Sequence, residues 1–221
     1  MEPSSMTKST RFAWIFDESA PRSAAACDQE ILRTDRLVAV PSAGALVAGW
    51  TLIVPRRPML NLASATVEER GAIELAASQI AKQLAQAGEQ IWFFEHGSRN
   101  VGGVMGCGVD QAHLHIVPLN FDLGAAIAQR SGDDIAWMVV TESETPLDAL
   151  PETGEYIAFW SISDLRPRIG MVRRPVSQWM RRVIADELGI GAEWDYRSYP
   201  QKVRVQQTLQ RLAPLMAQTT M

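Results

Sequence analysis

The sequence lacks the long apolar run that a membrane-spanning helix needs. No stretch of about 18 apolar residues occurs in its 221 residues, and Met1-Glu2-Pro3-Ser4-Ser5 lacks the basic and then apolar pattern of a signal peptide. Cysteine is scarce, because Cys27 and Cys107 form neither a Cys-x-x-Cys pair nor a disulfide framework. We therefore expect a cytoplasmic protein without a membrane anchor or a structural zinc site.

An excess of positive charge is also missing. The formal net charge is −4 and the isoelectric point is about 5.4. This charge argues against a nucleic-acid binder but is compatible with binding of a small nucleotide. No Gly/Ser-rich linker interrupts the chain, and 47% of the residues are hydrophobic. These features predict one continuous globule.

Histidine occurs only three times, and two of the three stand close together. They lie in the alternating run Gln111-Ala112-His113-Leu114-His115-Ile116-Val117-Pro118. Alternation predicts a strand with both imidazoles on one face, where they would meet one substrate with little freedom to lose. The alternative is that His113 and His115 are ordinary polar positions on the solvent face of a half-buried strand.

A glycine-rich stretch precedes the histidine strand. Four glycines, at 102, 103, 106 and 108, lie between Ser98 and the histidines. Such backbone lets amide groups approach an anion, although hairpin connections are often glycine-rich too. Beside two imidazoles, the segment Gly106, Cys107 and Gly108 becomes a candidate phosphate cradle.

These motifs together resemble the histidine-triad (HIT) superfamily of nucleotidyl hydrolases and transferases, whose signature is His-φ-His-φ-His-φ-φ with φ apolar. Gln111 stands at the first triad position, so the triad here is degenerate. Asn100 matches the asparagine that the family carries before its glycine loop. The segment from Gly49 to Pro58 is similar to Gly-His-x-Leu-Val-Ile-Pro-Lys-x-His, with Trp50 and Pro58 in place of the two histidines.

The resemblance implies an α+β fold, with an antiparallel sheet and a long helix packed on it, followed by a C-terminal extension of strands and helices. We expect a polar N-terminal segment with a short strand at 1–24, a HIT-like core at 25–130 and an extension packed on that core at 131–221. The local patterns predict strands at 11–17, 37–40, 50–54, 91–94, 135–140, 155–160 and 168–172, and helices at 66–87, 122–129, 175–189 and 200–212.

The helix at 66–87 has the clearest signals. Thr66 and Glu69 form a capping box, and the buried stripe is expected to consist of Val67, Ile73, Ala76, Ala77, Ile80 and Leu84. The strand that follows is so apolar that it should not be an open sheet edge. The resemblance implies a homodimer, with this helix and the strand at 91–95 as the expected surfaces.

The resemblance also implies roles for the motif residues. His113 matches the nucleophile that attacks the α-phosphorus, with its other ring nitrogen donating to the main-chain carbonyl at position 111. His115 would hold the phosphate or the leaving oxygen, while Asn100 and the amides of residues 106–108 would neutralise developing charge. The scheme requires no metal and no cofactor.

The nucleotide itself is expected against the hairpin of 37–54. The resemblance brings Val40, Ser42 and Trp50 to the base and ribose, with Ser42 where many members have an acidic residue. His96 is a candidate replacement for the missing imidazoles, in one network with Gln111 and His113. Its alternative is an ordinary histidine at a loop edge.

Two functions follow as hypotheses. The first is a hydrolase or nucleotidyltransferase acting at the α-phosphate of a nucleoside di- or polyphosphate, a dinucleoside polyphosphate or a phosphoramidate, with hydrolysis favoured because related transferases have Gln where this chain has His115. The second is a catalytically weakened nucleotide-binding protein. An arginine of the segment Ser177 to Arg182 would reach polyphosphate or lie on a solvated helix face, and we favour the solvated face for most of them.

Overall fold

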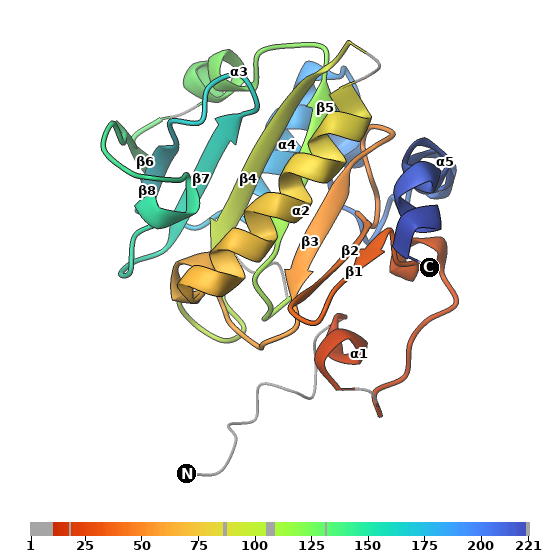
Figure 1. Ribbon diagram of the computed structural model, residues 1–221. Coiled ribbons are helices and arrows are strands. Elements are labelled where there is room, and N and C mark those ends of the chain that lie inside the picture. Colours follow the sequence, from red (N-terminus) through yellow and green to blue (C-terminus); the bar gives the residue numbers. More distant parts are fainter. Residues whose placement is uncertain (1–10, 18, 86–87, 105–108, 131, 220–221) are drawn as a thin grey trace.

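A computed structural model describes residues 11–17, 19–85, 88–104, 109–130 and 132–219. Its framework is one eight-stranded sheet in the order β1-β2-β3-β5-β4-β7-β8-β6, and every strand pair is antiparallel (Figure 1). The strands are β1 Leu32–Arg33, β2 Leu37–Pro41, β3 Thr51–Pro55, β4 Gln90–Gly97, β5 Leu114–Leu119, β6 Ile135–Val139, β7 Tyr156–Ser161 and β8 Arg168–Val172. The expected α+β architecture with an antiparallel sheet is confirmed.

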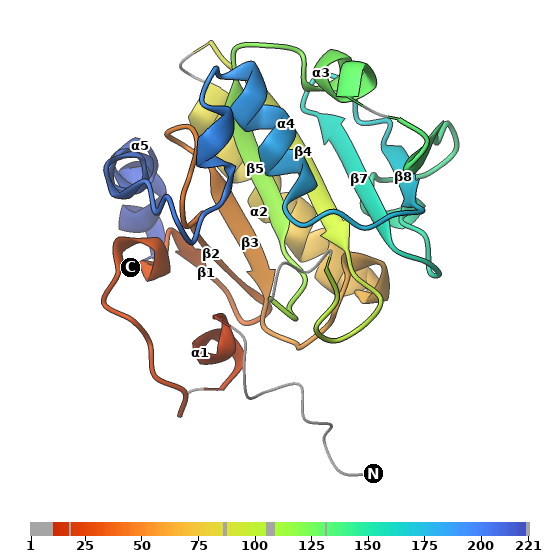
Figure 2. The same cartoon turned by 180° about the vertical axis from the view of Figure 1, so that it is seen from behind.

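Helices cover both faces of the sheet. The long helix α2 Val67–Ala85 crosses one face, and α4 Trp179–Glu187 crosses the other (Figures 1 and 2). The other helices are α1 Ala13–Phe16, α3 Leu123–Arg130 and α5 Lys202–Thr219, with short 3-10 turns η2 Ala26–Asp28, η3 Leu62–Ser64, η4 Leu147–Ala149 and η5 Gly191–Trp194. None of the helices in the described ranges is long and apolar enough to cross a lipid bilayer.

The start of α2 follows its sequence signals. The amide of Glu69 donates to Thr66 Oγ1, and the amide of Thr66 donates to the Glu69 carboxylate, so the capping box is confirmed. The stripe of Ile73, Ala76, Ala77, Ile80 and Leu84 is buried against the sheet. Val67 was wrongly included, because this first-turn side chain is 71% exposed and points away from the stripe. The predicted end at Ala87 lies outside the described residues.

The sheet separates two apolar cores. Helix α2 packs on Ile53, Phe93 and Ile116 on one face. On the other face, residues of α4 such as Met180 and Ile184 pack with Trp50, Phe94 and their neighbours. Each strand therefore contributes alternate residues to both cores, which explains why β2, β3 and β5 are buried throughout.

The C-terminal extension continues the sheet. Strand β7 pairs with β4 along its length, from Trp92 opposite Ser161 to Gly97 opposite Tyr156, and β8 and β6 follow. The prediction that the apolar strand is not an open edge is confirmed. The edge of β4 that we expected in a homodimer is occupied by the chain's own β7, so that surface was assigned wrongly.

The N-terminal segment differs from its prediction. Residues 11–17 form no strand, because α1 occupies Ala13–Phe16. Phe12, Trp14 and Ile15 are all buried in the core on the α4 face, a pattern that suits one helical turn better than alternation.

Two C-terminal helices differ from their predicted bounds. Helix α4 begins four residues after Pro175, and α5 continues to Thr219, past the predicted end at Leu212.

Candidate active site

The two histidines of the motif lie side by side at the start of β5. His115 is inside the strand, opposite Leu52 of β3 and Phe94 of β4, and His113 comes one residue before the strand begins. Their ring centroids are 4.7 Å apart. The His115 ring stacks on Phe94 at 4.2 Å, nearly parallel. Two flanking strands and this stacking hold His115 in one orientation.

His113 is held by the main chain. Its Nδ1 lies 2.8 Å from the carbonyl oxygen of Gln111. Because a carbonyl can only accept, Nδ1 carries the proton and Nε2 carries the lone pair. Burial lowers the pKa of His113 to about 4, an effect that the Gln111 carbonyl opposes and the charge of Arg11 increases. The ring is therefore neutral at pH 7 and has one nucleophilic nitrogen.

His115 has the opposite tautomer. The indole Nε1–H of Trp50 donates to His115 Nδ1 at 3.0 Å, and an indole nitrogen is only a donor. The proton of His115 is therefore on Nε2. Burial lowers the pKa of His115 well below its usual value, with smaller contributions from His113, His96 and Arg181. His115 is a neutral hydrogen-bond donor beside the nucleophilic nitrogen.

Trp50 has a different role from the predicted one. We expected it to contact the nucleotide, but its side chain is fully buried and does not line the cavity beside the histidines. It packs in the core on the α4 face, where its ring meets Phe94 and His115 edge-on. Trp50 therefore acts on the site through its hydrogen bond to His115 and through its ring, which contacts His115 edge-on and lies 5.0 Å from the Arg181 guanidinium.

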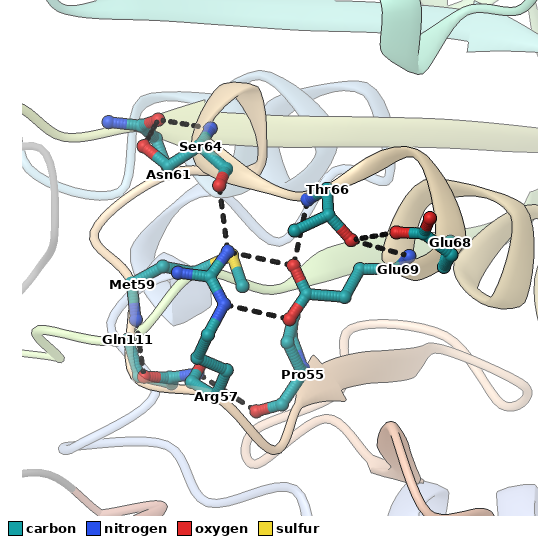
Figure 3. Close-up of polar contacts among 9 residues, drawn as sticks. All are labelled: Pro55, Arg57, Met59, Asn61, Ser64, Thr66, Glu68, Glu69 and Gln111. Carbon is teal, nitrogen blue, oxygen red and sulfur yellow. Dashed lines mark hydrogen bonds and ion pairs between the residues drawn. The ribbon is translucent and has the colours of Figure 1, made fainter.

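Gln111 anchors the loop that follows β3. Its Nε2 donates to the carbonyls of Pro55 (2.9 Å) and Arg57 (3.2 Å), and its Oε1 accepts from the amide of Met59 (3.3 Å) (Figure 3). With these bonds to the loop, the side chain of Gln111 makes no hydrogen bond to His113, which contacts only the Gln111 carbonyl. The expected network of His96, Gln111 and His113 side chains is therefore not formed, because the loop backbone uses the Gln111 amide.

A second set of bonds supports this loop from α2. Arg57 donates to both carboxylate oxygens of Glu69, at 2.8 and 2.7 Å, and to the carbonyl of Ser64 (Figure 3). Because Glu69 also caps α2, the helix start and the loop held by Gln111 form one connected unit. The carbonyl that orients His113 belongs to a residue fixed by this unit.

The histidines line a small cavity of about 60 Å³. Nine of its lining residues lie between positions 42 and 115: Ser42, Ala43, Leu52, Leu60, His96, Val109, Gln111, His113 and His115. Of the predicted site residues, Ser42, His96 and Gln111 are thus brought to the two catalytic candidates. His96 is the penultimate residue of β4, at the strand end as predicted, and its ring centroid is 6.1 Å from that of His115. Burial lowers the pKa of His96 to about 3, with smaller contributions from His113 and Arg181.

The other predicted residues are placed elsewhere or are not described. Val40 does not line the cavity, because its side chain is buried in the core on the α4 face. Asn100 is exposed and also outside the lining; its main-chain oxygen accepts from Ser98 Oγ and the amide of Gly103. Gly106, Cys107 and Gly108 lie outside the described residues.

Sequence reasoning missed the residues that close the cavity. Arg11 and Phe12 come from the N-terminal segment, and the Phe12 ring meets that of His113 edge-on at 5.7 Å. Gln178, Arg181 and Tyr196 come from the C-terminal extension. Arg181 belongs to the segment Ser177 to Arg182, but its distance from the motif in sequence hid the contact. The face of the sheet with the histidines is therefore covered and not open.

Positive charge dominates this cavity. Two guanidinium groups, from Arg11 and Arg181, line it, and no carboxylate does so among the described residues. Arg181 is held by main-chain carbonyls, with Nε donating to Trp194 at 2.8 Å and Nη2 donating to Gly44. Such a site favours an anion over a cation. Within the described ranges, no group of three or more His, Cys, Asp or Glu residues is arranged to hold a metal ion.

Comparison with known protein families agrees with this geometry. Residues 24–122 match the model of the HIT domain. These residues are the HIT-like part of the chain. The match contains both histidines, Trp50 and Gln111, whereas Arg11, Gln178, Arg181 and Tyr196 lie outside it. The cavity is thus built jointly by the HIT-like part and the segments before and after it.

Solved structures with a similar fold include HIT proteins. A HIT-like protein from Bartonella henselae is 20% identical, with a TM-score of 0.40, over 51% of this chain and 82% of its own. A histidine triad protein from Clostridium difficile is 20% identical, with a TM-score of 0.36, over 51% and 92%. Yeast Ap4A phosphorylase in complex with AMP is 14% identical, with a TM-score of 0.38, over 63% and 57%. No curated protein matches the sequence.

Proposed function

We propose that the protein is a nucleotide hydrolase that acts at an α-phosphate through a covalent nucleotidyl-His113 intermediate. The observation that carries the proposal is the pair of complementary tautomers: a lone pair on Nε2 of His113 and a proton on Nε2 of His115, with ring centroids 4.7 Å apart. A neutral nucleophile beside a neutral donor suits attack on a phosphorus that is shielded by negative oxygens.

The reaction has two displacements. In the first, Nε2 of His113 forms a bond to the α-phosphorus while the bond from phosphorus to the leaving group breaks. In the second, a water oxygen attacks the same phosphorus, the bonding pair returns to Nε2 of His113, and a water proton is released. Nδ1 of His113 keeps its proton and its bond to the Gln111 carbonyl throughout, which stabilises the positive charge of the intermediate ring.

The other residues of the cavity assist this chemistry. The Nε2–H of His115 donates to a phosphate or bridging oxygen, and the guanidinium groups of Arg11 and Arg181 neutralise phosphate charge. Ser42 is the residue of the β2–β3 hairpin that lines the cavity and would contact the ribose. No metal or cofactor takes part. With water replaced by another acceptor, the same intermediate would make the protein a nucleotidyltransferase.

A second function is favoured by one observation. A cavity of about 60 Å³ holds about two waters, and ligand pockets usually measure about 300 Å³ or more. Phe12 covers His113, so this segment must move before a nucleotide reaches the nucleophile. If Phe12 keeps His113 covered, the protein would bind nucleotides without hydrolysing them.

Intact-mass measurement separates the two functions. The protein is mixed with a panel of nucleoside polyphosphates, dinucleoside polyphosphates and nucleoside phosphoramidates, quenched rapidly and weighed. The hydrolase predicts a mass increase of one nucleoside monophosphate that His113→Ala abolishes. A thermal shift with the same ligands but no adduct and no product would leave the binding protein as the function.

A further inference from the structure

A second pocket lies between α3 and the strands β6, β7 and β8, at the end of the sheet opposite β1 (Figure 1). Its volume is about 200 Å³, and it shares no lining residue with the cavity beside the histidines. All of its lining residues follow residue 122, so it lies outside the match to the HIT domain. An engineered apolar cavity of about 150 Å³ binds benzene, so this pocket has room for one aromatic ring.

The lining of this pocket is apolar except at one position. Seven of the eight lining residues have an apolar side chain or are glycine, and the eighth is Arg168. The rings of Trp137 and Phe159 meet edge-on, with centroids 5.3 Å apart. A Cβ at Gly170 would lie 2.8 Å from the Trp137 ring, so glycine at this position lets the indole lie across β8. A flat apolar ligand would find two aromatic walls here.

Arg168 supplies a single positive charge. It lies opposite Phe159 of β7 and Val139 of β6, and its guanidinium carbon is 5.7 Å from the Phe159 ring centroid. With the residues that the structure describes, this guanidinium forms neither a hydrogen bond nor an ion pair. A guanidinium offers two parallel N–H groups to a carboxylate. Arg168 is therefore suited to hold the carboxylate of a ligand whose apolar part enters the pocket.

Gly124 allows the guanidinium to lie against α3. A Cβ at this position would be 2.5 Å from Nη1 of Arg168, so a larger residue would push the guanidinium away from the helix. The backbone of Gly124 does not require glycine, because it lies inside α3 and its φ is not positive. The glycine thus serves the placement of Arg168 and not the helix, in which alanine is more favourable.

The charges nearby favour a ligand with one negative charge. The hydrogen bonds from Arg166 lower the pKa of Asp164 to about 2, and Arg168 is near enough to make a small contribution. Asp122 Oδ1 would lie 3.1 Å from the same Cβ at Gly124. Two carboxylates thus lie near Arg168 without forming an ion pair with it. They disfavour phosphate and other multiply charged anions, whereas one guanidinium is enough to neutralise one carboxylate.

We propose that this pocket binds a small monocarboxylate with one aromatic ring. The carboxylate pairs with Arg168, and the ring packs against Trp137 and Phe159. The inference does not rest on the proposed hydrolase function, because binding at this pocket requires neither a nucleotide nor His113.

The first test titrates the wild-type protein with three probes by isothermal titration calorimetry, without nucleotide. Benzoate has both the ring and the charge, benzamide keeps the ring without the charge, and acetate keeps the charge without the ring. We expect a Kd below about 1 mM for benzoate and binding at least about tenfold weaker for the other two. Benzoate that does not bind in this range, or that binds no more tightly than benzamide or acetate, would overturn the proposal.

The second test removes the charge. Arg168→Gln should abolish the preference for benzoate over benzamide, because the variant has no guanidinium to distinguish them. Arg174→Gln is the matched control, since Arg174 follows β8 closely but does not line the pocket. Circular dichroism establishes that both variants are folded. An unchanged preference in a folded Arg168→Gln variant would contradict the proposal, and the three-probe comparison decides the matter if that variant does not fold.

The third test moves the guanidinium without removing it. Gly124→Ala should weaken benzoate binding by at least about threefold, because the added methyl group displaces Arg168. Gly71→Ala is the control, since Gly71 is also inside a helix and a Cβ there would meet nothing within 4 Å. Equal benzoate affinity in the wild type and a folded Gly124→Ala variant would mean that the placement of Arg168 against α3 has no part in binding.

A second copy of the chain is the other candidate for this surface. Met138 and Val139 of the edge strand β6 are 54% and 55% exposed and line the pocket. Sedimentation velocity at the concentration of the titrations separates the two occupants. A dimer that Met138→Asp dissociates, together with no benzoate binding, would assign the pocket to protein association and overturn the proposal.

Discussion

The indole nitrogen of Trp50 lies 3.0 Å from Nδ1 of His115, and this single bond determines which nitrogen of His115 faces the cavity. The family segment that resembles Gly49 to Pro58 has a histidine at the position of Trp50, and a histidine pair would be able to share a proton. Tryptophan donates but never accepts, so it makes His115 a fixed donor. The substitution therefore changes the chemistry that the site offers and does not simply remove a ligand contact.

Changing Trp50 should separate the hydrogen bond from the packing. Trp50→Phe keeps an aromatic ring in the core but removes the N–H, so His115 is free to take either tautomer and the adduct should form more slowly. Trp50→His restores a residue able to exchange a proton with His115 and should raise phosphoramidate cleavage relative to diphosphate cleavage. Rates for both substrates, measured beside the unfolding temperature of each variant, check this. An unchanged substrate ratio in a folded Trp50→His variant would argue against the role of the indole.

The rate should depend little on pH in the neutral range. The nucleophile is active as the free base, and the pKa of His113 is about 4, so it stays unprotonated from pH 8 down to about pH 5. Protonation removes the lone pair only below that range, and kcat/KM for the hydrolase should then fall as pH is lowered. A pH profile of kcat/KM is the measurement. A fall centred near pH 6.5 would mean that His113 titrates like an exposed histidine.

Stability should decline as pH rises, because of one buried carboxyl group. Glu95 is fully buried on the α2 face, where it accepts from the Leu62 amide (2.6 Å) and the Tyr156 hydroxyl (2.7 Å). Burial raises its pKa from 4.5 to about 7, against the smaller lowering effect of these bonds. Because the folded state holds the proton more tightly than the unfolded state, its contribution is complete below pH 4.5 and is lost as pH rises through 7. The loss amounts to about 3 kcal/mol at most.

Glu95→Gln isolates this effect. Glutamine keeps the shape and the acceptor for Leu62, but it does not titrate. Urea unfolding at pH 5 and pH 8 gives the change in free energy of unfolding between the two pH values. This change should be more positive in the variant than in the wild type by up to about 3 kcal/mol, because the variant lacks the loss that Glu95 causes. The three histidines, whose lowered pKa values act in the opposite direction below pH 6.5, are present in both proteins and cancel in the comparison. Identical pH dependence in the two proteins would contradict a titrating Glu95.

His96 and Gln111 should act independently. Their side chains share no hydrogen bond, since the Gln111 amide binds the main chain of residues 55–59. Gln111→Ala should lower the free energy of unfolding by about 1–3 kcal/mol, because buried carbonyl groups lose their donor. Losses of transition-state stabilisation in the double variant with His96→Ala should add within about 0.5 kcal/mol. A double-mutant cycle measures this, and a larger deviation would mean that the two residues are coupled through the ligand.

The local motifs were sufficient to predict much of the central sheet. Alternation around His113 and His115 predicted two rings on one side of a strand, and the Thr66 capping box predicted where α2 begins. The bond from His113 to the carbonyl at position 111 also followed, because it depends on the backbone and tolerates glutamine there. These features depend on residues a few positions apart, whose geometry the local chain determines.

Only the tertiary structure decided what lies around those two rings. Phe12 precedes His113 by about a hundred residues, and Arg181 follows it by nearly seventy, so no periodicity connects them. The pairing of β7 with β4 likewise depends on which apolar strand meets which edge when the extension folds back. The sequence by itself determined the strand and the two histidines that it positions, whereas the charge of the cavity, its cover and the tautomer of His115 arise from packing between distant segments, which local pattern does not encode.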